Sequence, residues 1–249
     1  MNAITASHWP YPRWIAHRGA GKLAPENTLA AFRLGAQHGY RMFECDAKLS
    51  ADGVPFLLHD ATLERTTNGR GTGGDLPLGA LAQLDAGSWH SRAYAGEAVP
   101  TLEALARFCI ANGYFLNIEI KPTPGQEETT GRVVGETAAR LWQGQAVPPL
   151  FSSFKPDALA GAQATAAHIP RALLLDTLWD GCLDTARRLG CVAIVCNHAL
   201  WDAALVDRVH AAGWRALSYT VNDEWAAERL IALGTDGVVT DRVDLFAPG

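Results

Sequence analysis

Two carboxylates, Glu44 and Asp46, stand one residue apart at the end of the run at residues 41–46. If that run is a β-strand, both side chains lie on one face and Cys45 points the other way. Taken alone, such a pair is more simply explained as the acidic face of a solvated edge strand. The alternative is half of a divalent-metal site, and the choice depends on what else the chain brings there.

Further charged groups end two other strand-like runs. Glu119 and Lys121 share one face of the run at residues 115–121, and His17 and Arg18 end the first such run of the chain. A salt-bridged strand end would explain the pair Glu119 and Lys121 about equally well. Their joint occurrence with two other carboxylates is what favours a functional site.

These carboxylates, cations and histidines are the residue types that bind a divalent metal and a phosphate group. Three carboxylates are hard oxygen ligands, which suit Mg²⁺ or Ca²⁺ better than Zn²⁺ or iron. Arg18 and Lys121 supply positive charge that three ligated carboxylates do not need, and a guanidinium matches phosphate oxygens. His17 and His59 are the natural proton-transfer pair, because an imidazole group ordinarily titrates near neutral pH. The set therefore predicts polarisation of a phosphoryl group.

Strand-like and helix-like runs alternate along the chain, which is typical of repeated βα units around a parallel sheet. The predicted strands are residues 13–17, 41–46, 54–59, 115–121, 149–153, 171–175, 191–196, 215–220 and 237–240. Helical patterns cover residues 29–38, 102–108, 133–142, 156–167, 182–189, 205–212 and 226–233, and Asn27 can cap the first. In a barrel of such units the active site lies at the C-terminal ends of the strands.

The run at residues 54–59 makes one strand too many for a closed eight-stranded barrel. Only residues 50–53 separate it from the preceding strand, too few for a parallel crossover, and they include an Asp-Gly hairpin signal. The extra strand must therefore return antiparallel. That return brings His59 beside Glu44 and Asp46.

Residues 60–100 lack helical periodicity and are rich in glycine. A loop of that length inside a compact domain is usually a functional insertion. We therefore predict a (β/α)₈ TIM barrel that forms one domain over residues 1–249. A small lid insertion, at about residues 47–100, lies between its second strand and second helix.

Composition narrows the function classes. The 249 residues are 48% hydrophobic and 19% charged, as expected of a globular domain with a real core. A net charge of -5 argues against nucleic acid and against an anionic membrane as partners. Residues 1–12 lack the features of a signal peptide, and the five cysteines show no C-x-x-C spacing. We expect a cytoplasmic protein, either monomer or dimer.

With these residues in view, the sequence resembles the glycerophosphodiester phosphodiesterases, and most of all the cytoplasmic bacterial members linked to glycerol-3-phosphate uptake. His-Arg-Gly alone is a weak signal, but the ordered set of motifs is specific and spans nearly the whole chain. The matching motifs are His17-Arg18-Gly19, Pro25-Glu26-Asn27-Thr28, Glu44-Cys45-Asp46, Asp52-Gly53, His59-Asp60, Thr66-Thr67-Asn68-Gly69, Leu84-Asp85-Ala86-Gly87-Ser88-Trp89, Pro100-Thr101-Leu102-Glu103, Glu119-Ile120-Lys121-Pro122, Ser152-Ser153-Phe154, Tyr219-Thr220-Val221-Asn222 and Thr240-Asp241.

The resemblance implies metal-dependent hydrolysis of glycerophosphodiesters, which are deacylated phospholipids such as glycerophosphocholine and glycerophosphoethanolamine, to glycerol 3-phosphate and an alcohol. It implies one divalent cation, Mg²⁺ or Ca²⁺, and a small-molecule substrate. The implied roles are metal ligation by Glu44, Asp46 and Glu119, acid–base catalysis by His17 and His59, and phosphate binding by Arg18 and Lys121. Expected in the pocket are Glu26, Asn27, Trp89, Phe154 and Tyr219, of which Tyr219 stands where many relatives carry tryptophan.

Several alternatives stay open at this level. We favour His17 as base and His59 as acid, but either order is compatible with the residues. The substrate's own 2-hydroxyl can attack phosphorus to give a cyclic phosphate, or water can attack directly. A phospholipase of similar architecture would want an exposed apolar or basic membrane face, and no such stretch is present. A catalytically silent sensor of metal and phosphate is disfavoured because both histidines and all three carboxylates are present.

Overall fold

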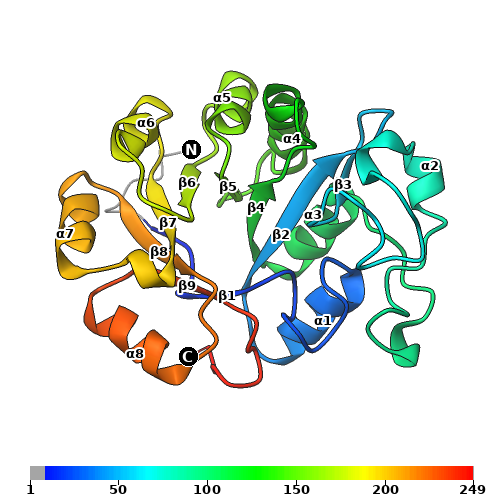
Figure 1. Cartoon of the computed structure of the whole chain (residues 1–249), viewed down its shortest axis with the longest axis horizontal. Helices are drawn as coiled ribbons and strands as arrows, with labels where there is room; N and C mark the ends of the chain where they lie inside the picture. Colours follow the sequence, from blue (N-terminus) through cyan, green and yellow to red (C-terminus); the bar gives the residue numbers. More distant parts are fainter. Residues whose placement is uncertain (1–8, 249) are drawn as a thin grey trace.

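The computed structural model describes residues 9–248, so the predictions about the first eight residues lie outside it. Its strands form one sheet in the order β1-β9-β8-β7-β6-β5-β4-β2-β3, which closes because β1 also pairs with β2 (Figure 1). The strands are β1 Trp14–Ala16, β2 Met42–Leu49, β3 Pro55–Leu57, β4 Phe115–Ile120, β5 Leu150–Ser153, β6 Arg171–Leu175, β7 Ala193–Asn197, β8 Arg215–Tyr219 and β9 Gly237–Thr240. All pairings are parallel except β2 with β3. The predicted (β/α)₈ barrel is therefore confirmed.

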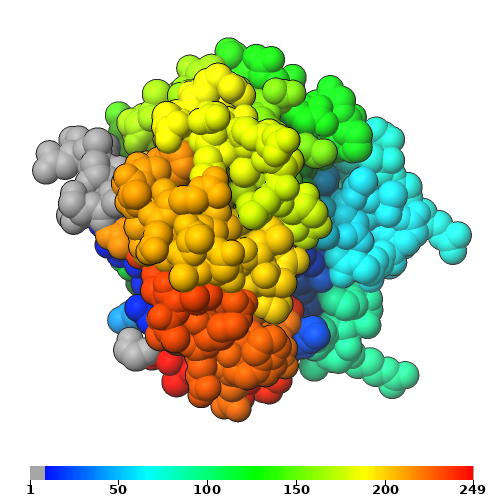
Figure 2. All heavy atoms as spheres, turned by 60° about the vertical axis from the view of Figure 1, so that its left-hand side comes forward, coloured from blue at the N-terminus to red at the C-terminus, as the bar shows by residue number. Residues whose placement is uncertain are grey.

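Helices surround the strands in Figure 1. They are α1 Leu29–Gln37, α2 Leu78–Leu81, α3 Leu102–Asn112, α4 Glu127–Leu141, α5 Pro156–Thr165, α6 Cys182–Arg188, α7 Ala203–Ala211 and α8 Glu224–Ala232. In Figure 2 the helices α6, α7 and α8 (yellow to orange) cover the side that faces the viewer. Among the described residues, no helix combines the length and the apolar character needed to cross a membrane.

Strand β2 shows how the barrel sorts its side chains. All eight of its residues are buried, as expected for a parallel strand covered on both faces. Cys45 packs in the core between strands and helices, whereas Met42 packs in the barrel interior with Ile15 and Leu150. Because side chains alternate, Glu44 and Asp46 follow Met42 on the interior face and reach its C-terminal end.

The extra strand returns as predicted. Strand β3 pairs antiparallel with β2 in the register Ala47↔Leu57, and Gly53 takes φ +77° in the turn between them. The backbone N–H of Leu58 then donates to the carbonyl of Asp46 over 3.1 Å. This pairing delivers His59, the next residue, to the carboxyl end of β2.

The predicted insertion, which continues after β3, has a small core of its own. Buried apolar residues from this segment and from β3 pack together: Phe56, Leu58, Leu63, Leu81, Ala86 and Val99. The segment contains the four-residue helix α2 and two short 3₁₀ turns, and in Figures 1 and 2 it lies at the edge of the barrel (cyan). That it acts as a lid stays a prediction.

Two local predictions were wrong. The N-cap of α1 is Thr28, whose hydroxyl accepts from the N–H of Ala31, because the side chain of Asn27 is engaged with Asp46 instead. Helix α4 begins at Glu127 rather than at residue 133. Its first turns pack through glycine rather than apolar side chains: a Cβ on Gly131 would lie 1.9 Å from a carbonyl oxygen of α5. Apolar periodicity cannot detect such a contact.

Candidate active site

Strands β2 and β4 position three carboxylates at one end of the barrel. The two strands pair in the register Asp46↔Glu119. Glu44 lies two residues before Asp46 and therefore on the same face of β2. One oxygen from each of Glu44, Asp46 and Glu119 lies within 4.8 Å of the others. The residues are 4%, 0% and 8% exposed, so this is a buried anionic cluster. It is the one group of this kind among residues 9–248.

Two cations neutralise the cluster in part. Arg18 Nε lies 3.2 Å from Asp46 Oδ2, and Lys121 Nζ lies 3.0 Å from Glu119 Oε1 and 3.6 Å from Asp46 Oδ1. Burial by itself raises the pKa of Asp46, but the charges of Arg18 and Lys121 outweigh it and hold that pKa well below its usual range. Asp46 is therefore ionised.

The pKa values of the other two carboxyls are shifted in the opposite direction. Burial, followed by the negative charge of Asp46, raises the pKa of Glu119 to about 7 and that of Glu44 well above its usual range. Glu44 Oε1 and Asp46 Oδ1 are buried without a hydrogen-bond partner. Metal–oxygen distances of about 2.0–2.6 Å are compatible with this oxygen spacing. The three carboxylates are thus suited to bind a divalent metal ion.

The loop after β1 folds over the carboxylates. The backbone N–H of Arg18 donates to Glu44 Oε2 over 3.1 Å, and Asn27 Nδ2 donates to Asp46 Oδ2 over 2.8 Å. Arg18 and Asn27 adopt φ values of +51° and +60°, the left-handed region that costs a non-glycine residue energy. Glu26 accepts from Arg18 Nη1 over 3.0 Å. These contacts hold the guanidinium of Arg18 beside the cluster.

His17 stands at the end of β1 and is backed by a carboxylate. Its Nδ1 lies 2.7 Å from Asp241 Oδ1, and its Nε2 lies 3.9 Å from Glu44 Oε2. Asn222 Nδ2 donates to the second oxygen of Asp241 over 2.9 Å. Asp241 was not among the residues predicted to act at this site. Its position directly after β9, at a strand end, was the signal that could have found it.

His59, like His17, has its Nδ1 beside a carboxylate. Its Nδ1 lies 2.7 Å from Asp60 Oδ1, and Lys121 Nζ donates to its Nε2 over 2.7 Å. Burial and the neighbouring cations Arg18 and Lys121 lower the pKa of His59, against the opposing effect of Asp46. Because Nε2 accepts from an ammonium group, it carries no proton in this arrangement, and Nδ1 is the protonated nitrogen.

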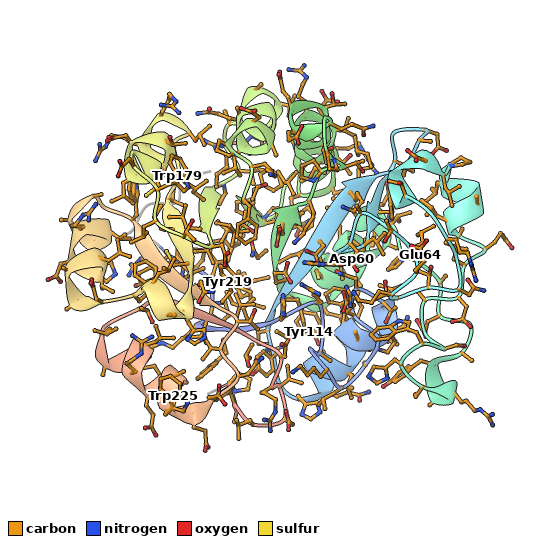
Figure 3. The ribbon with its side chains drawn as sticks, in the orientation of Figure 1. Asp60, Glu64, Tyr114, Trp179, Tyr219 and Trp225 are labelled. Atoms are coloured by element: carbon orange, nitrogen blue, oxygen red, sulfur yellow. The ribbon has the colours of Figure 1, made fainter. Side chains whose placement is uncertain are left out.

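A small cavity adjoins the carboxylates. Besides His17, Glu44 and Glu119 it is lined by polar and apolar barrel residues: Asn117, Ser152, Phe154, Leu174, Val195, Tyr219 and Val239. The rings of Phe154 and Tyr219 meet edge to face, with centroids 5.6 Å apart. Figure 3 shows Tyr219 near the middle of the barrel. The structure therefore brings two of the expected aromatic residues to the cavity.

Trp89, the third expected aromatic residue, is not among the residues that line this cavity. It is 41% exposed, and its indole N–H donates to the carbonyl of Ala86 within the insertion. The following residue, His90, bonds the carbonyl of Lys22 and so fixes this corner of the insertion beside the first loop. That Trp89 forms a pocket wall stays a prediction.

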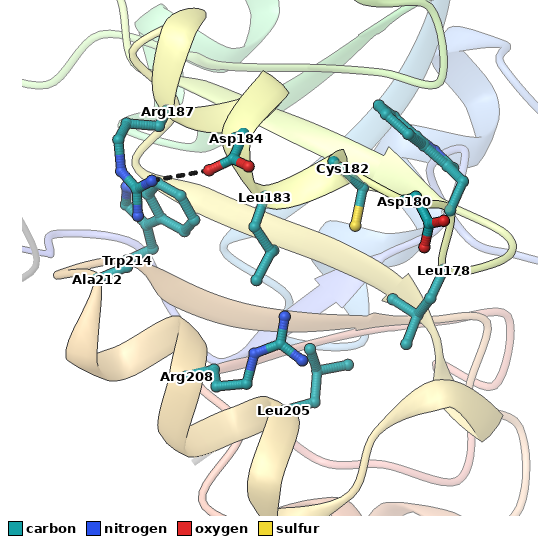
Figure 4. Close-up of a pocket in the computed structure, with 12 residues that line it drawn as sticks. Leu178, Asp180, Cys182, Leu183, Asp184, Arg187, Leu205, Arg208, Ala212 and Trp214 are labelled. Carbon is teal, nitrogen blue, oxygen red and sulfur yellow. Dashed lines mark hydrogen bonds and ion pairs between the residues drawn. The ribbon is translucent and has the colours of Figure 1, made fainter.

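A larger hollow lies between α6 and α7 on the outside of the barrel (Figure 4). Its charged residues include Arg187, which pairs with Asp184 over 3.0 Å and lies over the ring of Trp214. None of the carboxylates and histidines described above lines it. The candidate catalytic residues therefore lie at the strand ends and not in this hollow.

Known proteins resemble this chain over most of its length. The model of the glycerophosphoryl diester phosphodiesterase family matches residues 17–245. The chain is 32% identical over 233 residues to a glycerophosphodiester phosphodiesterase of Caldanaerobacter subterraneus, covering 91% of this chain and 93% of that protein. It is 30% identical over 250 residues to a glycerophosphodiester phosphodiesterase of Bacillus subtilis, covering 93% and 84%. A solved phosphodiesterase of Oleispira antarctica, in complex with the product sn-glycerol 3-phosphate, superposes with a TM-score of 0.86 at 37% identity, covering 92% and 93%.

Proposed function

The chain belongs to the glycerophosphoryl diester phosphodiesterase family and is a phosphodiesterase of that class, and from this we propose that it hydrolyses glycerophosphodiesters with the help of one divalent cation. The products would be sn-glycerol 3-phosphate, the product bound in the Oleispira relative, and an alcohol. The observation that carries the proposal is the buried cluster of Glu44, Asp46 and Glu119 between two cations and two carboxylate-backed histidines. A cytoplasmic location stays a prediction.

Glu44, Asp46 and Glu119 would hold the cation, because one oxygen of each lies close enough to the others to share one ion. A bound Mg²⁺ or Ca²⁺ would act as a Lewis acid toward a phosphoryl oxygen. Arg18 and Lys121 border the same cluster and would bind the non-bridging oxygens of the phosphate. Charge that builds up on those oxygens would then be stabilised by these two cations.

His17 and His59 would move the protons. One accepts the proton of the attacking hydroxyl, whether water or the substrate's own 2-hydroxyl, and the other donates a proton to the departing alkoxide. The contacts of His59 support it as the first acceptor rather than the acid, because its Nε2 is unprotonated and its pKa is lowered. On phosphate binding, Lys121 would turn to the phosphate and free that nitrogen.

Replacing Asp241 with asparagine is expected to lower kcat by about 10²–10⁴-fold, because His17 would be held in the wrong tautomer for proton transfer. Asn222 is fixed by accepting the backbone N–H of Asp241 with its Oδ1, so its Nδ2 must donate to the neighbouring side chain. In D241N the amide oxygen would stay with Asn222, and the amide NH₂ would face Nδ1 of His17. That arrangement selects the wrong tautomer of His17.

Steady-state kinetics of D241N at neutral pH would measure this loss, with Asp236→Asn as the control. Asp236 also pairs with a histidine, His210, but it lies at the opposite end of β9. Wild-type kcat in D241N would contradict the orienting role of Asp241.

The function itself is tested with three kinds of sample: water-soluble glycerophosphodiesters, vesicles of intact phospholipid, and inorganic phosphate with metal. Glycerol 3-phosphate release from glycerophosphocholine and glycerophosphoethanolamine in solution is the expected result. Release only from vesicles of intact phospholipid would indicate a phospholipase instead. Binding of inorganic phosphate and metal without any turnover would indicate a sensor. Either of the last two results would overturn the proposal.

A further inference from the structure

Arg65 lies in the segment after β3 and makes four hydrogen bonds to two carboxylates. Its Nη1 and Nη2 donate to Glu26 Oε2 and Oε1, each over 2.8 Å. Its Nε and Nη2 donate to Asp60 Oδ2 and Oδ1 over 2.6 and 3.1 Å. An isolated surface ion pair contributes little, but a guanidinium with two-point contacts to two carboxylates is geometrically fixed.

Each of these two carboxylates also contacts a residue of the active site. Glu26 Oε1, which accepts from Arg65, also accepts from Arg18 Nη1 over 3.0 Å. Asp60 Oδ1, which accepts from Arg65, also lies 2.7 Å from Nδ1 of His59. Arg65 Nη2 therefore donates to two shared oxygens. Glu26 Oε1 also accepts from Arg18, and Asp60 Oδ1 also contacts His59.

The backbone around Arg65 is anchored. Leu63 is fully buried in the small core of the insertion, and Thr66 and Thr67 are 4% and 8% exposed. The N–H and the hydroxyl of Thr67 both donate to the carbonyl of Leu63. Figure 3 shows Asp60 where the insertion meets the barrel. The guanidinium is therefore presented from a folded segment and not from a free loop end.

We propose that Arg65 is a positioning residue that holds Arg18 and His59 in one arrangement, through Glu26 and Asp60. The inference rests on the proposed phosphodiesterase function. It gives the insertion a definite task, since the group that aligns the phosphate-binding arginine with a proton-transferring histidine comes from that segment. Arg65 itself touches neither the carboxylate cluster nor the cavity beside it.

The test compares kcat and KM of R65A, R65K and R70A on glycerophosphocholine. Arg70 lies in the same segment and is exposed, which makes R70A the matched control. R65A is expected to lower kcat by about 10–100-fold, with a smaller change in KM, and R70A to match the wild type. R65K should stay within about threefold of R65A, because an ammonium group cannot make two-point contacts with both carboxylates. Melting temperatures of all variants show whether each is folded.

Double-mutant cycles decide whether Arg65 acts through its partners. If it does, R65A costs at least about threefold less in an E26A or D60A background than in the wild type. Equal costs in all backgrounds, full activity of R65A, or full rescue by R65K would each overturn the proposal. An inactive wild type would instead overturn the proposed function, so the two failures are distinguishable.

Discussion

Replacing either His17 or His59 with alanine is expected to lower kcat by about 10²–10⁴-fold, the usual contribution of a general acid or base. Each imidazole has its Nδ1 held by a carboxylate at 2.7 Å, Asp241 in one case and Asp60 in the other. That contact directs Nε2 of each ring toward the cluster: Nε2 of His17 faces Glu44, and Nε2 of His59 meets Lys121. Both proton transfers of the proposed reaction depend on these two atoms.

The measurement is kcat on a water-soluble glycerophosphodiester, with H168A as a control, since His168 is exposed and lies before β6, at the N-terminal rather than the C-terminal ends of the strands. The two variants should keep their affinity for metal, because neither histidine belongs to the carboxylate cluster. Near-wild-type turnover in both single variants would contradict the acid–base assignment. A loss in both that is accompanied by loss of metal binding would show that they act as ligands.

The substitution Asp46→Asn is expected to lower activity by about 10²–10³-fold, because a Lewis acid supplies several kcal/mol of transition-state stabilisation. Asp46 is fully buried, lies 3.2 Å from Arg18 Nε and 3.6 Å from Lys121 Nζ, and has one oxygen without a hydrogen-bond partner. An amide of the same shape removes the charge that these two cations and a divalent ion would share.

Metal affinity of D46N is measured by titration calorimetry with Mg²⁺ and with Ca²⁺, beside activity and melting temperature. Asp157→Asn is the control, because Asp157 is an exposed carboxylate at the start of α5. Wild-type metal affinity together with wild-type activity in D46N would contradict a metal site at this cluster.

The sequence predicted the barrel because its signals are local and repeated. Apolar strands alternate with helical runs, and the short connection before β3 leaves an antiparallel return as the only option. The same reasoning placed Glu44, Asp46 and Glu119 at neighbouring strand ends, where the structure brings their oxygens together. Such residues are predictable because strand periodicity alone fixes where they point.

Residues whose contacts depend on how loops close were not predicted. Asp241 contacts His17 from 224 residues along the chain, and Asn222 in turn donates to Asp241. Arg65 lies in a segment without periodicity, so no pattern indicated which carboxylates it reaches. Asn27 was mistaken for a helix cap because its side chain suits both a cap and a bond to Asp46. Only the folded chain distinguishes these possibilities.

The central claim is that the carboxylate cluster makes hydrolysis of glycerophosphodiesters depend on a divalent cation. The most direct measurement is a coupled assay of glycerol 3-phosphate release from glycerophosphocholine, run on protein treated with EDTA and then supplied with Mg²⁺, Ca²⁺ or Mn²⁺. We expect activity to disappear with EDTA and to return with at least one of these ions in the wild type, but not in D46N. Release that is insensitive to EDTA and unchanged by all three ions would contradict the account.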